Sequence, residues 1–343
     1  MRPVPRPAVS VLLPARDAVR TVERAVRSML EQTFRKLEVV AVDDGSIDGT
    51  GDVLARLASE DARVRIVRGE GRGIVAALNL GLSHCTAPLI ARMDADDESL
   101  PRRVERSVEA LERSPSLAGI GTQVELFRED RPVSPNLQLY AAWLNGMTDA
   151  DRLFRERFIE SPLCHPSTTL RASAIRDVGG WPEGPWPEDY ALWLRLLDAG
   201  HRLACVPEVL FRWRDHDQRL TRTDGRYSED AFRALKALHL ASPRGPLRNG
   251  RCRIWGAGAI GLRLARELRL HGVHVERLYD VALGKIGQTI DGSRVESWEA
   301  LSPPRADDAH LLAAVGAKGA REQIRTALVR LGYVEGEHFT CVA

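Results

Sequence analysis

The first hundred residues alternate between short apolar runs and segments with helical spacing, which restricts the possible folds more than any other feature. Four mainly apolar segments are predicted to be strands, at 9–13, 38–42, 64–67 and 88–93, and the first of them is predicted to be buried. Three segments between them are predicted to be helices, at about 19–30, 52–59 and 73–83. Strands that alternate with helices are typical of a parallel, doubly wound α/β sheet.

The rest of the chain indicates a second domain. The stretch from about 102 to 250 is less regular, although a helix is predicted over Glu188–Ala199. The segment 242–250 is rich in proline and glycine and is predicted to be a linker. Strand and helix patterns then resume. We therefore expect an α/β domain over 1–241 and a small, Rossmann-like α/β domain over 251–343.

Composition excludes several classes of protein. With 49 basic and 47 acidic residues the formal net charge is +2, which gives no general attraction to nucleic acid. The five cysteines form no C-x-x-C pair, so neither a disulfide framework nor a zinc site is expected, and a reducing cytoplasm is favoured. No apolar run approaches the roughly 20 residues of a transmembrane helix.

Acidic residues follow three of the predicted strands. They are Asp17, then Asp43 and Asp44, then Asp94 and Asp96. Aspartate favours turns, so any one of these could be ordinary loop chemistry. Ligands of open α/β sheets bind outside the carboxyl ends of the strands, however, and three acidic turns at that edge favour a binding site.

The spacing of the third turn suggests a particular chemistry. Carboxylates at positions i and i+2, such as Asp94 and Asp96, can converge on one divalent cation, which prefers oxygen ligands. A cation there could hold a diphosphate and stabilise the charge that develops as it leaves. Asp43 or Asp44 is better suited to accept hydrogen bonds from a base N–H group or a ribose hydroxyl.

Four ordered motifs resemble those of family 2 glycosyltransferases with the GT-A fold, over residues of about 8–225. The motifs are Val9–Asp17, Val42–Thr50, Met93–Asp97 and Glu188–Arg195. The resemblance implies transfer of a sugar from a nucleoside diphosphate, commonly UDP, with inversion at the anomeric carbon and with Mg²⁺ or Mn²⁺. It also implies a mixed or parallel doubly wound sheet.

Roles carried over by position follow from this resemblance. It implies a catalytic base at Asp189, where a helix N-terminus favours the ionised carboxylate. It implies metal ligands at Asp94, Asp96 and His216. It implies nucleotide contacts at Pro14, Asp17, Asp43, Asp44, Arg72 and Asp94. Acceptor contacts are expected at His165, Trp181, Trp186 and Glu188, with core packing an equally open interpretation for the two tryptophans.

Two departures from the family pattern refine the expected activity. Arg16-Asp17 stands where the first motif more often ends in Tyr-Asn, which weakens the nucleoside assignment there. Val209 occupies the position where processive members place Gln before Arg-Trp. We therefore expect addition of a single sugar to a glycan or lipid-linked hydroxyl, in cell-surface polysaccharide or glycoconjugate synthesis. A non-catalytic sugar-nucleotide sensor, a homodimer and peripheral attachment at the inner membrane face remain open.

The C-terminal region contains a second candidate nucleotide site. Gly256, Gly258 and Gly261 follow a predicted strand and open a helix, and Asp280 ends the next strand. That context fits a dinucleotide fingerprint, in which a helix N-terminus receives the pyrophosphate and an acid binds ribose hydroxyls. Residues 251–343 are only about half of a full dinucleotide fold. Binding of NAD is one interpretation, and a module used for packing, dimerisation or acceptor positioning is the other.

Overall fold

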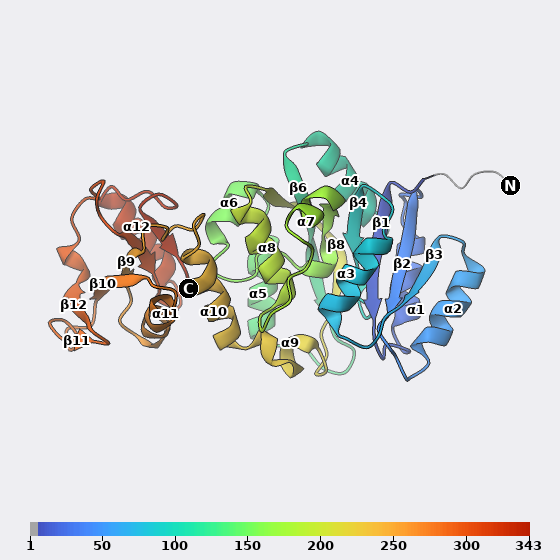
Figure 1. Ribbon diagram of the computed structural model, residues 1–343, viewed down its shortest axis with the longest axis horizontal. Coiled ribbons are helices and arrows are strands. Elements are labelled where there is room, and N and C mark those ends of the chain that lie inside the picture. Colours follow the sequence, from blue (N-terminus) through green and yellow to red (C-terminus); the bar gives the residue numbers. More distant parts are fainter. Residues whose placement is uncertain (1–5) are drawn as a thin grey trace. The chain divides into compact units, whose positions relative to one another are not determined.

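The computed structural model describes residues 6–343, which form two compact units (Figure 1). The first unit extends to Phe154 and continues through Pro162–Gly184 and Glu188–Thr223. The second comprises Arg155–Ser161, Pro185–Pro187 and Asp224–Ala343.

The first unit is built on an eight-stranded sheet in the described part of the chain, with strand order β3-β2-β1-β4-β7-β6-β8-β5. The strands are β1 (Val9–Ala15), β2 (Leu37–Asp43), β3 (Val64–Arg68), β4 (Leu89–Arg92), β5 (Glu98–Ser99), β6 (Leu117–Phe127), β7 (Thr169–Arg171) and β8 (Arg202–Arg214). β3, β2, β1 and β4 are parallel, whereas β7 pairs antiparallel with both β4 and β6. The predicted doubly wound α/β fold is confirmed, in its mixed form.

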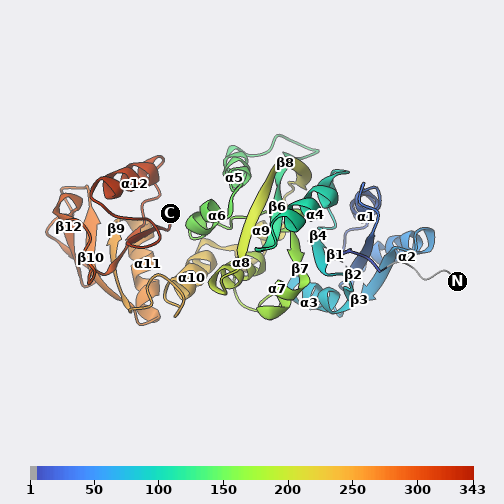
Figure 2. The ribbon, with the colours of Figure 1, turned by 90° about the horizontal axis from the view of Figure 1, so that it is seen from above.

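Helices cover both faces of this sheet. They are α1 (Val22–Leu30), α2 (Thr50–Glu60), α3 (Ile74–His84), α4 (Arg103–Arg113), α5 (Pro135–Asn145), α6 (Ala150–Glu156), α7 (Ala172–Asp177), α8 (Glu188–Asp198) and α9 (Leu220–Thr223), with the 3₁₀ helix η1 (His165–Ser167). α1 and α2 lie on one face of the parallel strands and α3 lies on the other (Figure 2). Gly81 lets α3 approach β1, because a Cβ there would lie 2.2 Å from Leu12.

This arrangement brings the acidic turns to one edge. Every residue of β1 is buried, as expected for a mainly apolar strand at the centre of a parallel sheet. Because β1, β2 and β4 are parallel, their carboxyl ends meet at the same edge of the sheet. The three acidic turns therefore follow neighbouring strands.

The second unit has its own sheet, with strand order β11-β12-β10-β9-β13-β14. Its strands are β9 (Arg251–Trp255), β10 (His274–Asp280), β11 (Thr289–Ile290), β12 (Ser293–Ser297), β13 (His310–Ala313) and β14 (Phe339–Cys341). Its helices are α10 (Glu229–Leu240), α11 (Ala259–Leu270), α12 (Ala320–Arg330) and the 3₁₀ helices η2 (Gly225–Tyr227) and η3 (Trp298–Ala300). α11 and α12 cover opposite faces of the sheet (Figures 1 and 2).

The boundary between the units differs from the predicted one. The sequence placed it at the 242–250 segment, whereas the contacts within the structure place helix α10 in the second unit. α10 packs on α11, and Leu235 and Leu240 are fully buried. The proline-rich segment forms a folded turn, in which Leu247 is buried and its N–H donates to the carbonyl of Leu240 over 3.0 Å.

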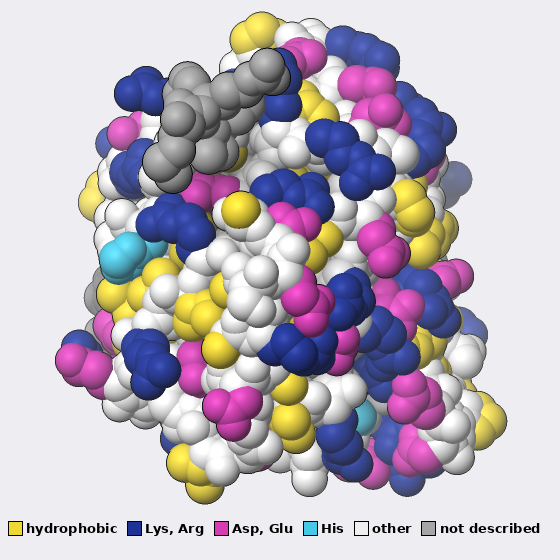
Figure 3. Space-filling view, turned by 90° about the vertical axis from the view of Figure 1, so that its right-hand side faces the viewer, with side chains coloured by type: hydrophobic (Ala, Val, Ile, Leu, Met, Phe, Trp, Pro, Cys, Tyr) yellow, Lys and Arg dark blue, Asp and Glu magenta, His cyan; other side chains and the backbone are white. Residues whose placement is uncertain are grey.

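The charged side chains on the surface are of both signs, in keeping with the formal net charge of +2. Basic and acidic side chains are interspersed over the face that Figure 3 shows. On α1 and α2, Glu23, Arg27, Arg56 and Glu60 form one network of exposed ion pairs. The five cysteines are buried and unpaired. Over residues 6–343, no helix has both the length and the apolar character needed to cross a bilayer.

Candidate active site

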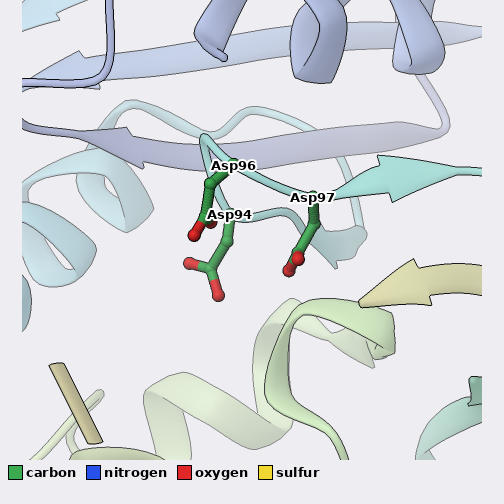
Figure 4. Close-up of side chains that lie close together, drawn as sticks. All are labelled: Asp94, Asp96 and Asp97. Carbon is green, nitrogen blue, oxygen red and sulfur yellow. The ribbon is translucent and has the colours of Figure 1, made fainter. Parts of the chain in front are cut away.

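Three carboxylates come together in the turn that follows β4. Asp94, Asp96 and Asp97 each offer an oxygen, and these oxygens lie within 4.8 Å of one another. Figure 4 shows the three side chains on one short loop, with Asp94 and Asp96 directed into the same space. The loop leads into β5, which pairs with β8 and so fixes its far end. Clustered carboxylates of this kind can hold a hard divalent cation.

Asp97 carries an orphaned oxygen in this cluster. Its Oδ1 accepts a hydrogen bond from the backbone N–H of Arg214 over 2.8 Å, whereas Oδ2 is buried and meets no donor in the described chain. Burial, together with the charges of Asp96 and Asp94, raises the pKa of Asp97 well above its usual value. Burial also raises the pKa of Asp94, against the opposing effect of Arg92. A divalent cation would satisfy this otherwise costly arrangement, so the residues fit a metal.

Arg92 orients the first acid of the cluster. It ends β4 with a side chain that is 2% exposed, and its Nη2 donates to Oδ1 of Asp94 over 2.6 Å. Its Nη1 donates to the carbonyl of Met93. Arg92 is not among the residues predicted for the site. The available signal was an arginine in an otherwise apolar strand, two positions before Asp94.

His216 reaches the cluster from the segment that follows β8. Its Nε2 lies 2.8 Å from Oδ2 of Asp96, and the two side chains are 35% and 33% exposed. Nε of Arg214 donates to the carbonyl of Asp96 over 2.7 Å, which joins the end of β8 to the acidic turn. Of the three predicted metal ligands, Asp94 and Asp96 thus lie in one cluster with Asp97, and His216 contacts Asp96.

The turns after β1 and β2 are tied to each other. Oδ1 of Asp17 accepts from the N–H of Ile47 over 2.9 Å, and the N–H of Asp17 donates to Oγ of Ser46 over 3.1 Å. Asp17 has a φ of 48°, a conformation that aspartate adopts more readily than most residues. Oδ1 of Asp43 accepts from the N–H of Ser46 over 3.1 Å, and Pro14 is buried within β1.

Asp44 is engaged by the main chain. Its Oδ1 accepts from the N–H groups of Gly71 and Arg72 over 3.0 and 3.2 Å, and its Oδ2 accepts from Gly73 over 2.8 Å. Its predicted contact with a nucleoside therefore competes with three backbone donors. Asp44 holds the turn that starts α3, with the exposed Arg72 on it, whereas Asp43 accepts from the N–H of Ser46 within its own turn.

Glu188 and Asp189 open α8. Asp189 is partly exposed, and its Oδ1 accepts from the N–H of Tyr190 over 2.7 Å. The helix N-terminus favours its ionised form. Glu188 is only 4% exposed, so the expectation that it contacts an acceptor is not supported. The inner face of α8 is anchored by Tyr190 and Trp193, which are fully buried.

Two predicted acceptor residues lie in the core. His165 and Trp181 are 6% and 2% exposed, and Nε1 of Trp181 donates to Nε2 of His165 over 2.9 Å. We had expected these two side chains to contact an acceptor sugar. The structure corrects this expectation, because both side chains are covered by protein. Trp186 is half-buried, and no hydrogen-bond acceptor among residues 6–343 meets its Nε1.

The fold and the site define the chain as a GT-A-type enzyme of sugar transfer, and the comparisons with known proteins give its family. Residues 10–179 match the model described as glycosyl transferase family 2. The chain is 30% identical over 247 residues to the putative glycosyltransferase EpsE of Bacillus subtilis (strain 168), with 68% of this chain and 84% of EpsE covered. The chain therefore belongs to glycosyl transferase family 2, as its motifs predicted.

Solved structures share the fold. TarS 1–349 of S. aureus in complex with UDP has a TM-score of 0.53 at 15% identity, with 68% of this chain and 65% of that chain covered. The mannosyltransferase PcManGT of Pyrobaculum calidifontis, in complex with GDP-Man and Mn²⁺, has a TM-score of 0.50 at 22% identity, with 69% and 62% covered. The chain thus spans less than two thirds of either structure, and both comparisons support the GT-A fold alone.

Proposed function

We propose that the first unit is a metal-dependent, inverting transferase that moves one sugar from a nucleoside-diphosphate sugar to an acceptor hydroxyl. The observation that carries this proposal is the acid cluster after β4, with the orphaned Oδ2 of Asp97 beside Asp94 and Asp96. These acids and His216 would hold the cation. A bound Mg²⁺ or Mn²⁺ would offset the charge of a diphosphate and stabilise the charge that develops as it leaves.

The donor is proposed to be a UDP-sugar. Asp43 and Asp17, at the ends of β2 and β1, would accept hydrogen bonds from its base or ribose, and Asp44 would hold the turn that carries Arg72. TarS in complex with UDP supports this donor class. PcManGT in complex with GDP-Man makes a GDP-sugar the alternative within the same chemistry.

Asp189 is the proposed general base. As the acceptor oxygen attacks the anomeric carbon, Asp189 takes the proton of that hydroxyl. The bond from the anomeric carbon to the diphosphate breaks on the opposite face, so the configuration inverts in one displacement. A carboxylate at a helix N-terminus is ionised at neutral pH and ready to accept this proton.

The acceptor is proposed to be a hydroxyl of a glycan or of a lipid-linked sugar. Val209 stands where processive members have Gln, which supports one addition per binding event. A role in cell-surface polysaccharide or glycoconjugate synthesis belongs to the same proposal.

The test is nucleotide release by the full chain. The protein is incubated with UDP-sugars and GDP-sugars in Mn²⁺, Mg²⁺ or EDTA, with glycan and lipid-linked acceptors, and free nucleoside diphosphate is measured. Release should require the cation, and Asp189→Asn should lower it by about 10²-fold or more, the range of general-base catalysis. Asp198→Asn, at the other end of α8, is the matched control. Donor binding with no turnover on any acceptor would favour the sugar-nucleotide sensor instead.

A further inference from the structure

The second unit contains a cavity of about 670 Å³ that the proposed transfer reaction does not use. It lies at the carboxyl ends of β9, β10 and β13, where Trp255, Asp280 and Ala314 contribute to its wall. β9 pairs with β10 on one side and with β13 on the other, so the strand order reverses at this point. Open α/β sheets bind ligands at such a switch point, and the volume is in the range of small-molecule sites.

One wall of the cavity suits a phosphate. Gly258, Ala259 and Ile260 line it at the start of α11, where backbone N–H groups have no partner within the helix. Lys285 also lines it, and its Nζ lies 3.1 Å from Oδ2 of Asp280. Asp280 itself holds the loop, because its oxygens accept from the N–H groups of Ala257 and Ala282, each over 2.9 Å.

Another wall suits a flat apolar ring. Trp255 and Trp298 stack with their ring centroids 5.2 Å apart and their planes inclined by 16°. Both line the cavity, together with Val315 and Ile324. Trp298 is half-buried, so one part of this aromatic pair is accessible. Every nucleic base has a flat aromatic face, so any base can stack on an aromatic side chain of this kind.

The three glycines of the fingerprint have different reasons to be glycine. A Cβ at Gly256 would lie 2.5 Å from the carbonyl oxygen of Ala314, and a Cβ at Gly261 would lie 1.9 Å from that of Gly256. Packing of the protein therefore explains these two. Gly258 has an ordinary φ of −96°, and a Cβ there would meet nothing within 4 Å. A side chain at Gly258 would stand in the cavity, which is where a phosphate would approach the backbone.

We propose that this cavity binds a single nucleoside phosphate, with its phosphate at the N-terminus of α11 beside Lys285 and its base against Trp298. A dinucleotide binds across two complete βαβαβ halves. Here β9, β10 and β12 form one side of the parallel sheet, but only β13 and β14 form the other, and β11 is an antiparallel addition. The unit therefore provides one nucleotide position and not the two that NAD requires.

Calorimetry on the full chain tests this site apart from the transferase site. AMP, ADP, UMP, UDP and NAD⁺ are titrated in EDTA into the wild type and into Asp96→Asn, in which the proposed cation site of the first unit is damaged. One of the four mononucleotides should bind both proteins with a stoichiometry of one. Gly258→Val should weaken that binding by at least about tenfold, which is about 1.4 kcal/mol.

A matched substitution separates a lost ligand from a lost fold. Gly225, in the same unit but outside the cavity, also has open space at its Cβ, so Gly225→Val should bind like the wild type. Gly258→Val should keep its melting temperature within about 2 °C. If it does not fold, Lys285→Gln replaces it and should weaken binding of the diphosphates more than of the monophosphates.

Three results would overturn the proposal. One is that none of the four mononucleotides binds in EDTA. Another is that binding is unchanged in Gly258→Val and in Lys285→Gln. The third is that NAD⁺ binds at least about tenfold more tightly than every mononucleotide, which would assign a dinucleotide site. None of these results depends on whether the first unit transfers a sugar.

Discussion

Nε2 of His165 accepts a hydrogen bond from Nε1 of Trp181 over 2.9 Å, and the His165 ring packs edge-on against Trp193 at 5.7 Å. Trp193 belongs to α8, the helix that Asp189 opens. Trp181 is held in turn by Asn79, which exchanges two hydrogen bonds with its backbone over 2.8 and 2.9 Å. A buried contact between η1 and α8 therefore holds the helix that carries the proposed catalytic base.

Loss of the Trp181 donor should destabilise the first unit. Trp181→Phe leaves Nε2 of His165 buried without a partner, at a cost of about 1–3 kcal/mol, in addition to the cost of the smaller ring. Urea unfolding measures the change. Trp143→Phe, in a partly buried ring that stacks on Tyr140, is the control and should cost less. Equal stability of the two variants would contradict a structural role for the Trp181–His165 bond.

The same histidine should make stability depend on pH. Burial, with a contribution from the charge of Arg92, lowers the pKa of His165 well below its usual value of 6.5. The unfolded chain therefore binds a proton that the folded chain does not, and the free energy of unfolding falls as the pH drops below about 6.5. The slope contributed by one such group is at most about 1.4 kcal/mol per pH unit.

Urea titrations at pH 7, 6 and 5 in EDTA should show this slope. His165→Gln should be less stable at pH 7 but should lose less stability on acidification than the wild type. His310, in the second unit, has a pKa that burial lowers to about 4, so it adds a slope of its own. His310→Gln is therefore the comparison variant. Parallel pH profiles of the wild type and His165→Gln would show that His165 is not the buried neutral group described.

The sequence predicted the parallel half of the first sheet well, because its strands are short, mainly apolar segments that alternate with segments of helical spacing. It did not predict β6 or β8. β6 contains Gly119 and Gly121, residues that favour turns, yet a Cβ at Gly119 would lie 2.2 Å from Leu170. β8 contains Pro207 and Glu208, and its register with β6 shifts by bulges. Close packing and irregular pairing set these strands, and neither leaves a periodic pattern.

The acidic edge could be predicted because each acid directly follows a strand. Which of these acids face a ligand and which hold the backbone could not be predicted. The carboxylate of Asp44 accepts hydrogen bonds from the backbone of residues 71–73. The path of this turn depends on tertiary packing. The burial of Trp181 depends on Asn79, 102 positions away in the chain. The sequence therefore located the site but did not separate residues that face a ligand from residues that support them.

Asp43 and Asp44 should respond differently to the same substitution. Asp44→Asn replaces one acceptor oxygen with an NH₂ group facing a backbone donor, so it should lower stability by about 1–3 kcal/mol and weaken donor binding as a consequence. Asp43→Asn should raise the KM for the nucleotide sugar with little change in melting temperature. Donor kinetics and thermal unfolding, measured on both variants, test this division. A donor KM unchanged in Asp43→Asn would remove Asp43 from the nucleoside site.

Asp97 should stabilise the cation-bound protein at the expense of the metal-free protein. In EDTA, Asp97→Asn removes a buried carboxylate with one orphaned oxygen and two acidic neighbours, so its melting temperature should rise by a few degrees, about 2–4 °C per kcal/mol. Its amide oxygen can still accept from the N–H of Arg214. With Mn²⁺ the difference in melting temperature between Asp97→Asn and the wild type should shrink or change sign. A cation that binds only the folded state should stabilise the wild type more, because the wild type binds it more tightly. Asp52→Asn, on the exposed side of α2, should change neither value.

An equal Mn²⁺-induced shift in Asp97→Asn and the wild type would place Asp97 outside the cation site. A lower melting temperature of Asp97→Asn in EDTA would show that its buried carboxylate is satisfied without a metal.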